Sequence, residues 1–197
     1  MINRDLLLSY GAEIKNYKTN EVIFREGEFS TYYYQIADGK IKLNNYTEEG
    51  KEFIQNIFSD GQSFGESILF VNKPYPMNAE ALIPSNIIRL PKSEFLILLK
   101  ENPEISTNIH HCLAERMYYK YIMLYNLSIQ NPASKLKLLM DYLKTYDDNK
   151  EPYSFQIPLT RQQLASLTGL RVETVIRVIK SMEKENSLKI VNRKIFY

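Results

Sequence analysis

Two charged side chains near the C-terminus, Glu173 and Arg177, stand one helical turn apart within an apolar pattern of helical spacing. Residues four apart lie on the same face of a helix, so both side chains can reach one surface. Arginine donates two parallel hydrogen bonds to guanine and glutamate accepts one from cytosine, so this pair is suited to reading base edges in a DNA major groove. The alternative is a solvated ion pair that stabilises the helix by a few tenths of a kcal/mol.

The residues around this pair predict two short helices joined by a tight turn. Thr160 and Gln163 have the spacing of a capping box, in which each side chain bonds the backbone N–H of the other at a helix start. Gly169 tolerates the left-handed backbone that ends the first helix, and apolar residues of helical spacing resume at Val172. Three of these are predicted to pack on the first helix: Val175, Ile179 and Met182.

The opposite face of the second helix, which spans residues 171–184, is predicted to contact DNA bases. Its base-reading residues are Val172, Glu173, Ile176 and Arg177. Apolar side chains on this exposed face suit the methyl groups of thymine. Beyond the helix, residues 188–191 and 194–197 flank Asn192-Arg193 and predict a β-hairpin. A hairpin in this position is a wing, whose basic tip we expect to contact phosphate.

The charge distribution favours the same class of partner. Residues 160–197 contain eight Lys/Arg and three Asp/Glu, a net charge of +5, whereas the first 159 residues contain 17 and 20, a net charge of −3. A basic module at one end of a chain is typical of polyanion binding. Together with the helix-turn-helix pattern, it predicts double-stranded DNA as the partner.

The composition excludes several other classes of protein. The 197 residues suffice for one large or two small domains, and 44% hydrophobic and 24% charged residues are typical of a soluble protein. The N-terminal residues lack the pattern of a signal peptide, and no apolar run approaches the roughly 20 residues of a membrane helix. The single Cys112 excludes an intramolecular disulfide and fits a reducing compartment. We therefore expect a cytoplasmic protein with no membrane partner.

Short runs of aromatic and β-branched residues, separated by glycine turns, predict a strand-rich region before about residue 91. The candidate strands are residues 21–24, 32–37, 40–46, 52–58, 77–82 and 87–90. Many short strands of this kind are typical of a small antiparallel β-barrel or jelly roll. Tyr32-Tyr33-Tyr34 on one strand could form a stacking surface for a base, or pack on the two sides of the strand.

Helical patterns follow the barrel. Residues 93–100 predict a short helix, and Asn102-Pro103 begins a longer one over residues 104–127. Its apolar stripe has roughly heptad spacing and predicts a homodimer through residues 104–127; the alternative is a helix packed along the barrel. The stripe consists of Ile109, Leu113, Met117, Leu124 and Leu127.

A second Asn-Pro pair, Asn131-Pro132, starts another helix, so we place a hinge between Ser128 and Pro132. The predicted fold class is therefore α+β with three segments. These are an effector-sensing barrel domain over 1–103, a dimerisation helix and hinge over 104–130, and a winged helix-turn-helix domain over 131–197.

This order of elements resembles the bacterial Crp/Fnr family of transcription factors, named for the cyclic-AMP receptor protein and the fumarate-nitrate regulator. The resemblance covers almost the whole chain, and it implies a homodimer that reads an inverted repeat and acts on RNA polymerase. Its most specific motifs are Thr160-Arg161-Gln162, Gly169-Leu170, Val172-Glu173-Thr174-Val175 with Arg177, and Gly61-Gln62-Ser63-Phe64-Gly65-Glu66.

The resemblance implies roles for individual residues of the DNA-binding module. It assigns Glu173 and Arg177 to bases, and other residues mainly to the phosphate backbone. The complete set that we predict at the backbone is Thr160, Arg161, Gln162, Arg171, Thr174, Lys180, Arg193 and Lys194. Two positions depart from the family: Arg171 stands where Ser or Thr usually caps the helix, and Ile176 replaces a small or polar residue.

The resemblance also places an effector site at Gly65-Glu66-Ser67 in the barrel. In family members that bind cyclic nucleotides, the glutamate binds the ribose and an Arg-Ser pair neutralises the phosphate; the matching pair here is Met77-Asn78. Burying a phosphodiester without a guanidinium costs free energy, and Lys120-Tyr121 replaces the hydroxyl pair that reads adenine. We therefore expect a structural Glu66 and no binding of cyclic AMP. We expect control by an unidentified small-molecule effector in the barrel; the alternatives are a cyclic-nucleotide-responsive regulator and a ligand-independent regulator with a degenerate barrel.

Other sensing chemistries have weaker support. His110, His111 and Cys112 adjoin on the long helix, but consecutive helical residues point roughly 100° apart and cannot close on one ion within one chain. An iron–sulfur cluster of the family type needs several N-terminal cysteines, which this sequence lacks. We expect no metal and no cofactor.

Two other function classes are disfavoured. Metal-dependent enzymes on small barrels need His/Glu clusters on their strands, and the barrel region contains no histidine. A signalling adaptor that used the barrel alone would leave the +5 module unexplained. The sequence therefore predicts a DNA-binding regulator and not an enzyme.

Overall fold

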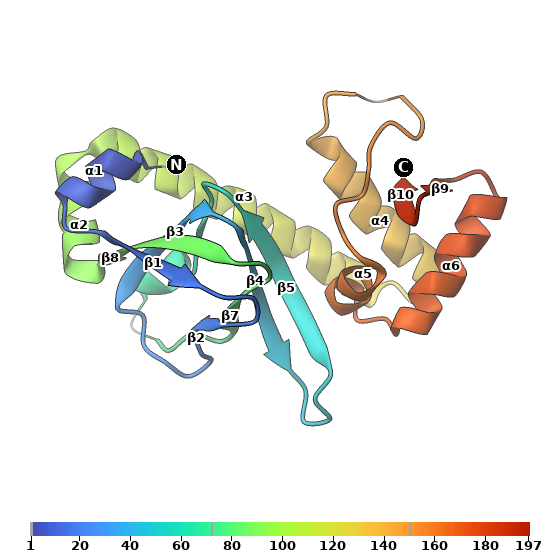
Figure 1. Cartoon of the computed structure of the whole chain (residues 1–197), viewed down its shortest axis with the longest axis horizontal. Coiled ribbons are helices and arrows are strands. Elements are labelled where there is room, and N and C mark those ends of the chain that lie inside the picture. Colours follow the sequence, from blue (N-terminus) through green and yellow to red (C-terminus); the bar gives the residue numbers. More distant parts are fainter. Residues whose placement is uncertain (1, 72, 150) are drawn as a thin grey trace. The chain divides into compact units, whose positions relative to one another are not determined.

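The computed structural model describes residues 2–71, 73–149 and 151–197. The chain packs as two compact units, residues 1–116 and 117–197, and the long helix α3 (Pro103–Ser128) contains the division between them. Figure 1 shows the order of the elements along the chain. None of the described helices is both long enough and apolar enough to cross a membrane.

The first unit is built on two antiparallel sheets of four strands each. Their strand orders are β1-β8-β3-β6 and β2-β7-β4-β5, so the predicted antiparallel barrel or jelly roll is confirmed. The strands are β1 (Glu13–Tyr17), β2 (Val22–Phe24), β3 (Tyr32–Asp38), β4 (Lys40–Tyr46), β5 (Glu52–Ser59), β6 (Ser63–Phe64), β7 (Asn78–Ala81) and β8 (Ser85–Pro91).

Strands β1 and β6 lie outside the predicted set. β1 exposes four of its five residues. It therefore lacks the alternation of buried and exposed positions by which a half-buried strand is found in a sequence. β6 has only two residues, and it becomes a strand by pairing with Tyr34 and Gln35 of β3. Both elements depend on partners far away in the sequence.

The space between the two sheets is filled largely by aromatic rings. Phe24 stacks on Tyr75 with ring centroids 3.7 Å apart, and Tyr34 stacks on Phe64 at 5.4 Å. Tyr33 lies on the other side of β3 and stacks at 4.4 Å on Phe95 of helix α2 (Lys92–Glu101). Tyr33 and Tyr34 are therefore core residues on the two sides of one strand, and not an exposed stacking surface for a base.

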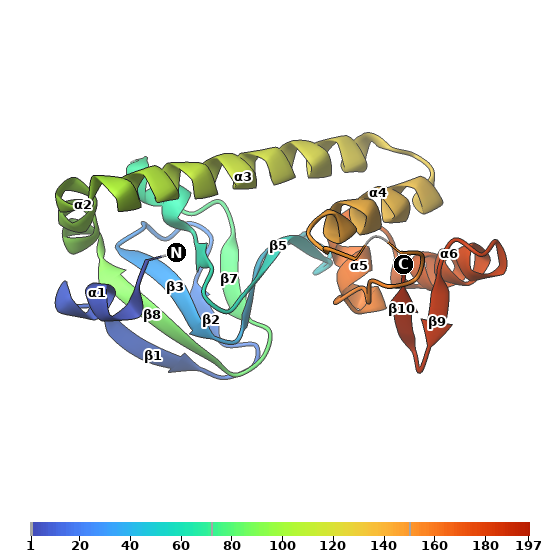
Figure 2. The same ribbon diagram turned by 90° about the horizontal axis from the view of Figure 1, so that it is seen from above.

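A second apolar core of this unit joins the sheet to helix α1 (Arg4–Ser9), helix α2 and the start of α3 (Figure 2). This core buries Ile109 and packs against Leu113. The prediction that Ile109 belongs to a dimer stripe is wrong, because the barrel unit already buries it, whereas Leu113 is only partly buried and its place in the stripe stays a prediction. The first half of α3 instead follows the alternative, a helix packed along the barrel.

The second unit contains α4 (Pro132–Thr145), α5 (Arg161–Thr168), α6 (Val172–Lys184) and the hairpin of β9 (Lys189–Val191) and β10 (Lys194–Phe196). The predicted hinge coincides with the interruption between α3 and α4, although the boundaries of the three predicted segments stay a prediction. Residues 153–157, predicted to be strand-like, form only the isolated bridge between Gln156 and Phe196. Tyr153 has a φ of 61°, a left-handed backbone that a strand cannot contain.

Candidate DNA-binding surface and effector site

Helices α5 and α6 meet in the geometry that the sequence predicts. The Thr160 hydroxyl accepts a hydrogen bond from the Gln163 backbone N–H at 3.1 Å, and the Gln163 side chain accepts one from the Thr160 N–H at 2.8 Å. Gly169 ends α5 with a φ of 71°. Residues with a Cβ atom are strained in this left-handed conformation, so glycine allows the tight turn into α6.

Helix α6 buries one face and exposes the other. Val175, Ile179 and Met182 are at most 5% exposed, as predicted. The outer face has an open hollow of ≈ 560 Å³. The hollow is lined by Glu173, Ile176, Arg177, Lys180, Ser181 and Lys184. The four of these residues that the sequence assigned to DNA are therefore brought together on one surface.

Glu173 and Arg177 are both exposed, and no ion pair among the described residues joins them. The alternative of an ion pair that stabilises the helix is thus not the arrangement here. Arg171 stands at the N-cap of α6 and makes no side-chain capping bond within the described part of the chain. Val172 and Thr174 are half-buried, so the two are less accessible than Glu173, Ile176 and Arg177.

The β9–β10 hairpin forms a wing beside these helices (Figure 2). Its two-residue turn, Asn192-Arg193, has positive φ at both positions, 49° and 64°. This combination defines the type I′ turn that joins two strands most tightly. Arg193 and Lys194 are exposed at the tip, where the sequence predicted them.

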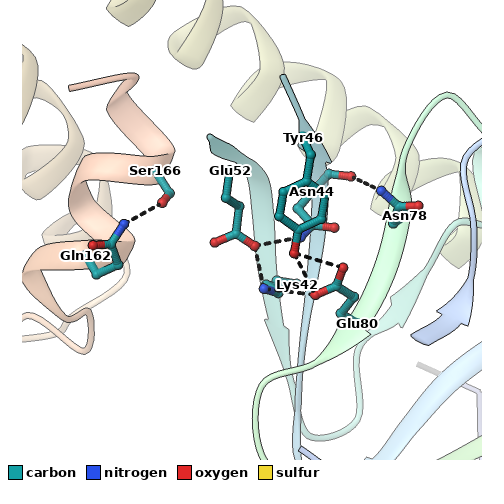
Figure 3. Close-up of polar contacts among 8 residues, drawn as sticks. All are labelled: Lys42, Asn44, Tyr46, Glu52, Asn78, Glu80, Gln162 and Ser166. Atoms are coloured by element: carbon teal, nitrogen blue, oxygen red, sulfur yellow. Dashed lines mark hydrogen bonds and ion pairs between the residues drawn. The ribbon is translucent and has the colours of Figure 1, made fainter. Parts of the chain in front are cut away.

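The residues at the start of α5 also have partners within the protein. The Arg161 guanidinium donates a hydrogen bond to the backbone carbonyl of Arg193 in the wing. Gln162 is exposed and donates to the Ser166 hydroxyl at 3.4 Å (Figure 3). The sequence gives no local signal for the first contact, because its two residues are 32 positions apart.

The C-terminal half of α3 exposes a stripe of large apolar and aromatic side chains. Met117, Tyr121 and Leu124 have the i, i+4, i+7 spacing of a coiled-coil seam and are 56%, 63% and 68% exposed. Tyr118, Tyr125 and Leu127 flank them and are also exposed. We name these six residues the α3 stripe. It contains Met117, Leu124 and Leu127 of the predicted stripe, but not the buried Ile109.

The predicted effector turn, residues 65–67, follows β6 and contains the start of the short 3-10 helix η1 (Glu66–Phe70). Glu66 is fully buried and forms an ion pair with Arg116 of α3. Arg116 also donates to the Ser63 hydroxyl at 3.2 Å. Apart from the ion pair, neither carboxylate oxygen of Glu66 receives a hydrogen bond from the described residues. Sequence reasoning missed Arg116, whose only signal is a basic residue beside the apolar pattern of the long helix.

Tyr75 fills the barrel interior beside this turn. A Cβ atom at Gly65 would lie 3.1 Å from the Phe24 ring and 3.3 Å from the Tyr75 ring. The Tyr75 hydroxyl donates to the Ser30 hydroxyl at 3.0 Å, and both residues are buried. Burial raises the pKa of Tyr75 to about 12, so the phenol is neutral at physiological pH.

The other predicted effector residues do not form a charged pocket. Met77 is 6% exposed and belongs to the same aromatic core, and the Asn78 side chain accepts from the backbone N–H of Glu26 at 3.0 Å. Ser67 is exposed. Lys120 and Tyr121 are exposed residues of the second unit.

Two family models match this chain. Residues 14–102 match the cyclic nucleotide-binding domain, and residues 136–196 match the Crp-like helix-turn-helix domain. Both parts of one kind of two-domain regulator are thus present in the order predicted. The chain belongs to the Crp/Fnr family of transcription regulators. It is a DNA-binding protein with an effector-binding domain, and not an enzyme.

Relatives of this Crp/Fnr regulator include proteins named for cyclic AMP. It is 27% identical over 175 residues to the cAMP-activated global transcriptional regulator CRP of Haemophilus influenzae, covering 88% of this chain and 78% of that protein. It is also 27% identical over 186 residues to the cyclic AMP receptor protein of Thermus thermophilus, covering 94% and 83%. Regulators of this family dimerise and bind effectors.

Solved structures share the fold at low sequence identity. The CooA mutant of Carboxydothermus hydrogenoformans superposes with a TM-score of 0.81 at 16% identity, covering 100% of this chain and 87% of that chain. The c-di-GMP responsive regulator CLP of Xanthomonas campestris gives 0.79 at 18% identity, covering 98% and 96%. Proteins similar to this chain are thus named for different effectors, cyclic AMP and c-di-GMP.

A polar network on β4, β5 and β7 supports the barrel of this Crp/Fnr regulator without belonging to the predicted site (Figure 3). Lys42 forms ion pairs with Glu52 and, at 3.0 Å, with Glu80. Although burial lowers the pKa of Lys42, hydrogen bonds to these two carboxylates outweigh it and raise the pKa above its ordinary value. The network therefore consists of a charged lysine held between two acids.

His110 and His111 are exposed and Cys112 is half-buried on α3. Burial raises the pKa of the Cys112 thiol, which disfavours the reactive thiolate. Among the described residues, no group of three or more His, Cys, Asp or Glu side chains lies close enough to hold one metal ion.

Proposed function

We propose that this Crp/Fnr regulator acts as a homodimer in which helix 171–184 of each copy reads one half of an inverted-repeat operator, with RNA polymerase as its downstream partner. The observation that carries the proposal is the outer face of α6, where Glu173 and Arg177 are exposed and not paired with each other. Arg177 has the donors for guanine and Glu173 the acceptor for cytosine. Ile176, 40% exposed, offers an apolar contact for a thymine methyl.

The α3 stripe supports a second copy of the chain as the partner for dimerisation. Met117, Tyr121 and Leu124 repeat at coiled-coil spacing, and each is more than half exposed. A parallel, two-fold seam would bury these side chains against their own counterparts. It would also give two recognition helices related by the symmetry of an inverted repeat.

We further propose that the barrel does not bind cyclic AMP. The stacked rings of Phe24 and Tyr75 fill the interior beside Gly65. Met77 is a core residue at the position where the family resemblance expects an arginine for the phosphate. A cyclic phosphodiester would thus meet aromatic and thioether groups in place of a guanidinium, and burial of its charge would go uncompensated.

A second candidate for the barrel rests on Glu66. Its buried carboxylate has Arg116 on one side and receives no hydrogen bond from the described residues. Buried carboxylates normally accept several hydrogen bonds, so an uncharged effector with a hydroxyl donor would suit this position. The family also contains relatives named for cyclic AMP.

The DNA proposal is tested with the full chain and an operator selected from random DNA. Loss of the two guanine hydrogen bonds at each half-site in Arg177→Ala should reduce the preference for this operator over random DNA by about tenfold or more per half-site. Salt-sensitive binding to any sequence should persist, because phosphate contacts remain. Fluorescence anisotropy measures both affinities, with Lys180→Ala as a control that weakens binding to all sequences alike. Full sequence preference in Arg177→Ala would show that α6 does not read bases in this way.

The effector proposal is tested by calorimetric titration of the full chain with cyclic AMP and cyclic GMP. We expect no saturable heat with either nucleotide. Saturable binding of either nucleotide in the wild type that is lost in Glu66→Ala would contradict the proposal.

A further inference from the structure

We propose that Arg161 and Glu183 position the wing on the helix-turn-helix, and that Arg161 affects DNA affinity through Arg193 and Lys194 and not as an independent phosphate ligand. This inference rests on the proposed DNA binding and adds two positioning residues to it. Neither role follows from the sequence, which assigned Arg161 to the DNA backbone and left Glu183 without a role.

The geometry joins one charged side chain from each helix to the wing. Arg161, the first residue of α5, donates from its guanidinium to the backbone carbonyl of Arg193 at the tip. Glu183, in the last turn of α6, accepts from the backbone N–H of Ile190 in β9 at 3.0 Å. The wing is therefore attached at its tip to α5 and along its first strand to α6.

The base of the wing has separate support. Ile195 of β10 is 1% exposed, and its carbonyl accepts from the Ile157 N–H at 2.9 Å. The Tyr197 N–H donates to the Phe155 carbonyl at 2.8 Å. These bonds hold β10 to the segment before α5, so removal of the Arg161 or Glu183 contact should change the position of the tip without unfolding the hairpin.

The Arg161 contact stabilises an unfavourable backbone conformation at the tip of the wing. Arg193 has a φ of 64°, a left-handed conformation that glycine and asparagine adopt readily and arginine rarely. A bond to the carbonyl of this same residue favours the turn that directs the tip. Without it, the Arg193 and Lys194 side chains have more conformations to lose when they contact phosphate, and affinity falls.

The experiment is a double-mutant cycle on the full chain with its selected operator. Affinity is measured by anisotropy over a series of salt concentrations for the wild type, Arg161→Ala, the wing variant Arg193→Ala/Lys194→Ala, and the triple variant. If Arg161 acts through the wing, the triple variant should bind like the wing variant, within about twofold, because the effects of coupled residues do not add. If Arg161 contacts phosphate by itself, the effects multiply and each lost phosphate contact lowers the salt slope by about 0.9. That second outcome would overturn the inference.

A second test uses Glu183, whose charge is opposite to that of Arg161. Removing a negative charge near DNA should strengthen binding if charge alone matters, whereas the wing inference predicts severalfold weaker binding for Glu183→Ala. Glu183→Gln loses the same charge but keeps a carbonyl acceptor for the Ile190 N–H, so its affinity should stay at or above that of the wild type. Equal affinities of the Ala and Gln variants would exclude Glu183 as a positioning residue.

The controls separate failure of this inference from failure of the proposed function. Thermal unfolding by circular dichroism reports whether each variant is folded, and neither Arg161 nor Glu183 takes part in the Thr160–Gln163 capping box. If the wild type selects no operator, the proposed DNA binding is wrong. Two results with a wild type that binds its operator would show that only the wing inference is wrong. One is an Arg161→Ala variant that binds as tightly as the wild type. The other is a loss of affinity in Arg161→Ala that multiplies with the loss in the wing variant.

Discussion

Helix α6 and the barrel turn place the same two residue types in opposite environments. Glu173 and Arg177 of α6 are exposed and not joined to each other, whereas Glu66 and Arg116 of the barrel unit form an ion pair with the glutamate fully buried. Exposed charges gain only about 0–1 kcal/mol by pairing, so Glu173 and Arg177 lose little by staying apart and available for DNA. A buried pair cannot be divided without leaving an uncompensated charge in a medium of low dielectric constant. Environment, and not residue type, therefore separates the proposed recognition surface from the buried ion pair.

The largest expected effect comes from removing one member of the buried pair. Arg116→Met should lower the free energy of unfolding by about 3–5 kcal/mol, because Glu66 would keep a buried charge without a partner. Arg177→Met on the exposed surface is the matched control and should change it by at most about 0.5 kcal/mol. Urea unfolding followed by circular dichroism measures both variants. Similar losses in the two would remove the contrast between the sites.

The aromatic filling of the barrel gives a second large effect. Tyr75→Ala should cost about 3–5 kcal/mol in stability, because it leaves a cavity against the Phe24 ring. Tyr75→Phe keeps the ring and loses only the hydrogen bond to Ser30, so it should cost about 1 kcal/mol. Urea unfolding at 25 °C measures both, and operator preference measured below the unfolding transition should be unchanged. A stable Tyr75→Ala protein would show that this interior is not packed by Tyr75.

The smallest expected change in stability concerns Arg171, at the start of the exposed helix α6. Arg171 occupies the N-cap without a side-chain capping bond among the described residues. Arg171→Ser supplies a capping hydroxyl and should raise the free energy of unfolding by about 0.5–2 kcal/mol. The same change removes a cation expected at a phosphate, so affinity for all DNA sequences should fall and the salt slope should decrease by about 0.9. A rise in both stability and affinity would show that Arg171 does not contact DNA.

Elements with short-range signals could be predicted from the sequence. The capping box, Gly169 and the apolar spacing of α6 lie within 23 residues and define two helices and their turn with little help from the rest of the chain. The β9–β10 wing was also predicted, because Asn192-Arg193 separates two short apolar runs. Strand β1 was not predicted, since four of its five residues are exposed and its pairing with β8 is distant in sequence.

The amino-acid sequence by itself determined the winged helix-turn-helix, the antiparallel barrel and the absence of a family-type arginine at Met77. Only the tertiary structure decided that the barrel unit buries Ile109, that Glu66 pairs with Arg116, and that Arg161 contacts the wing. The physical reason is the range of the interactions. Caps, turns and helical periodicity join residues a few positions apart, whereas burial and ion pairing depend on which distant segments the folded chain brings into contact.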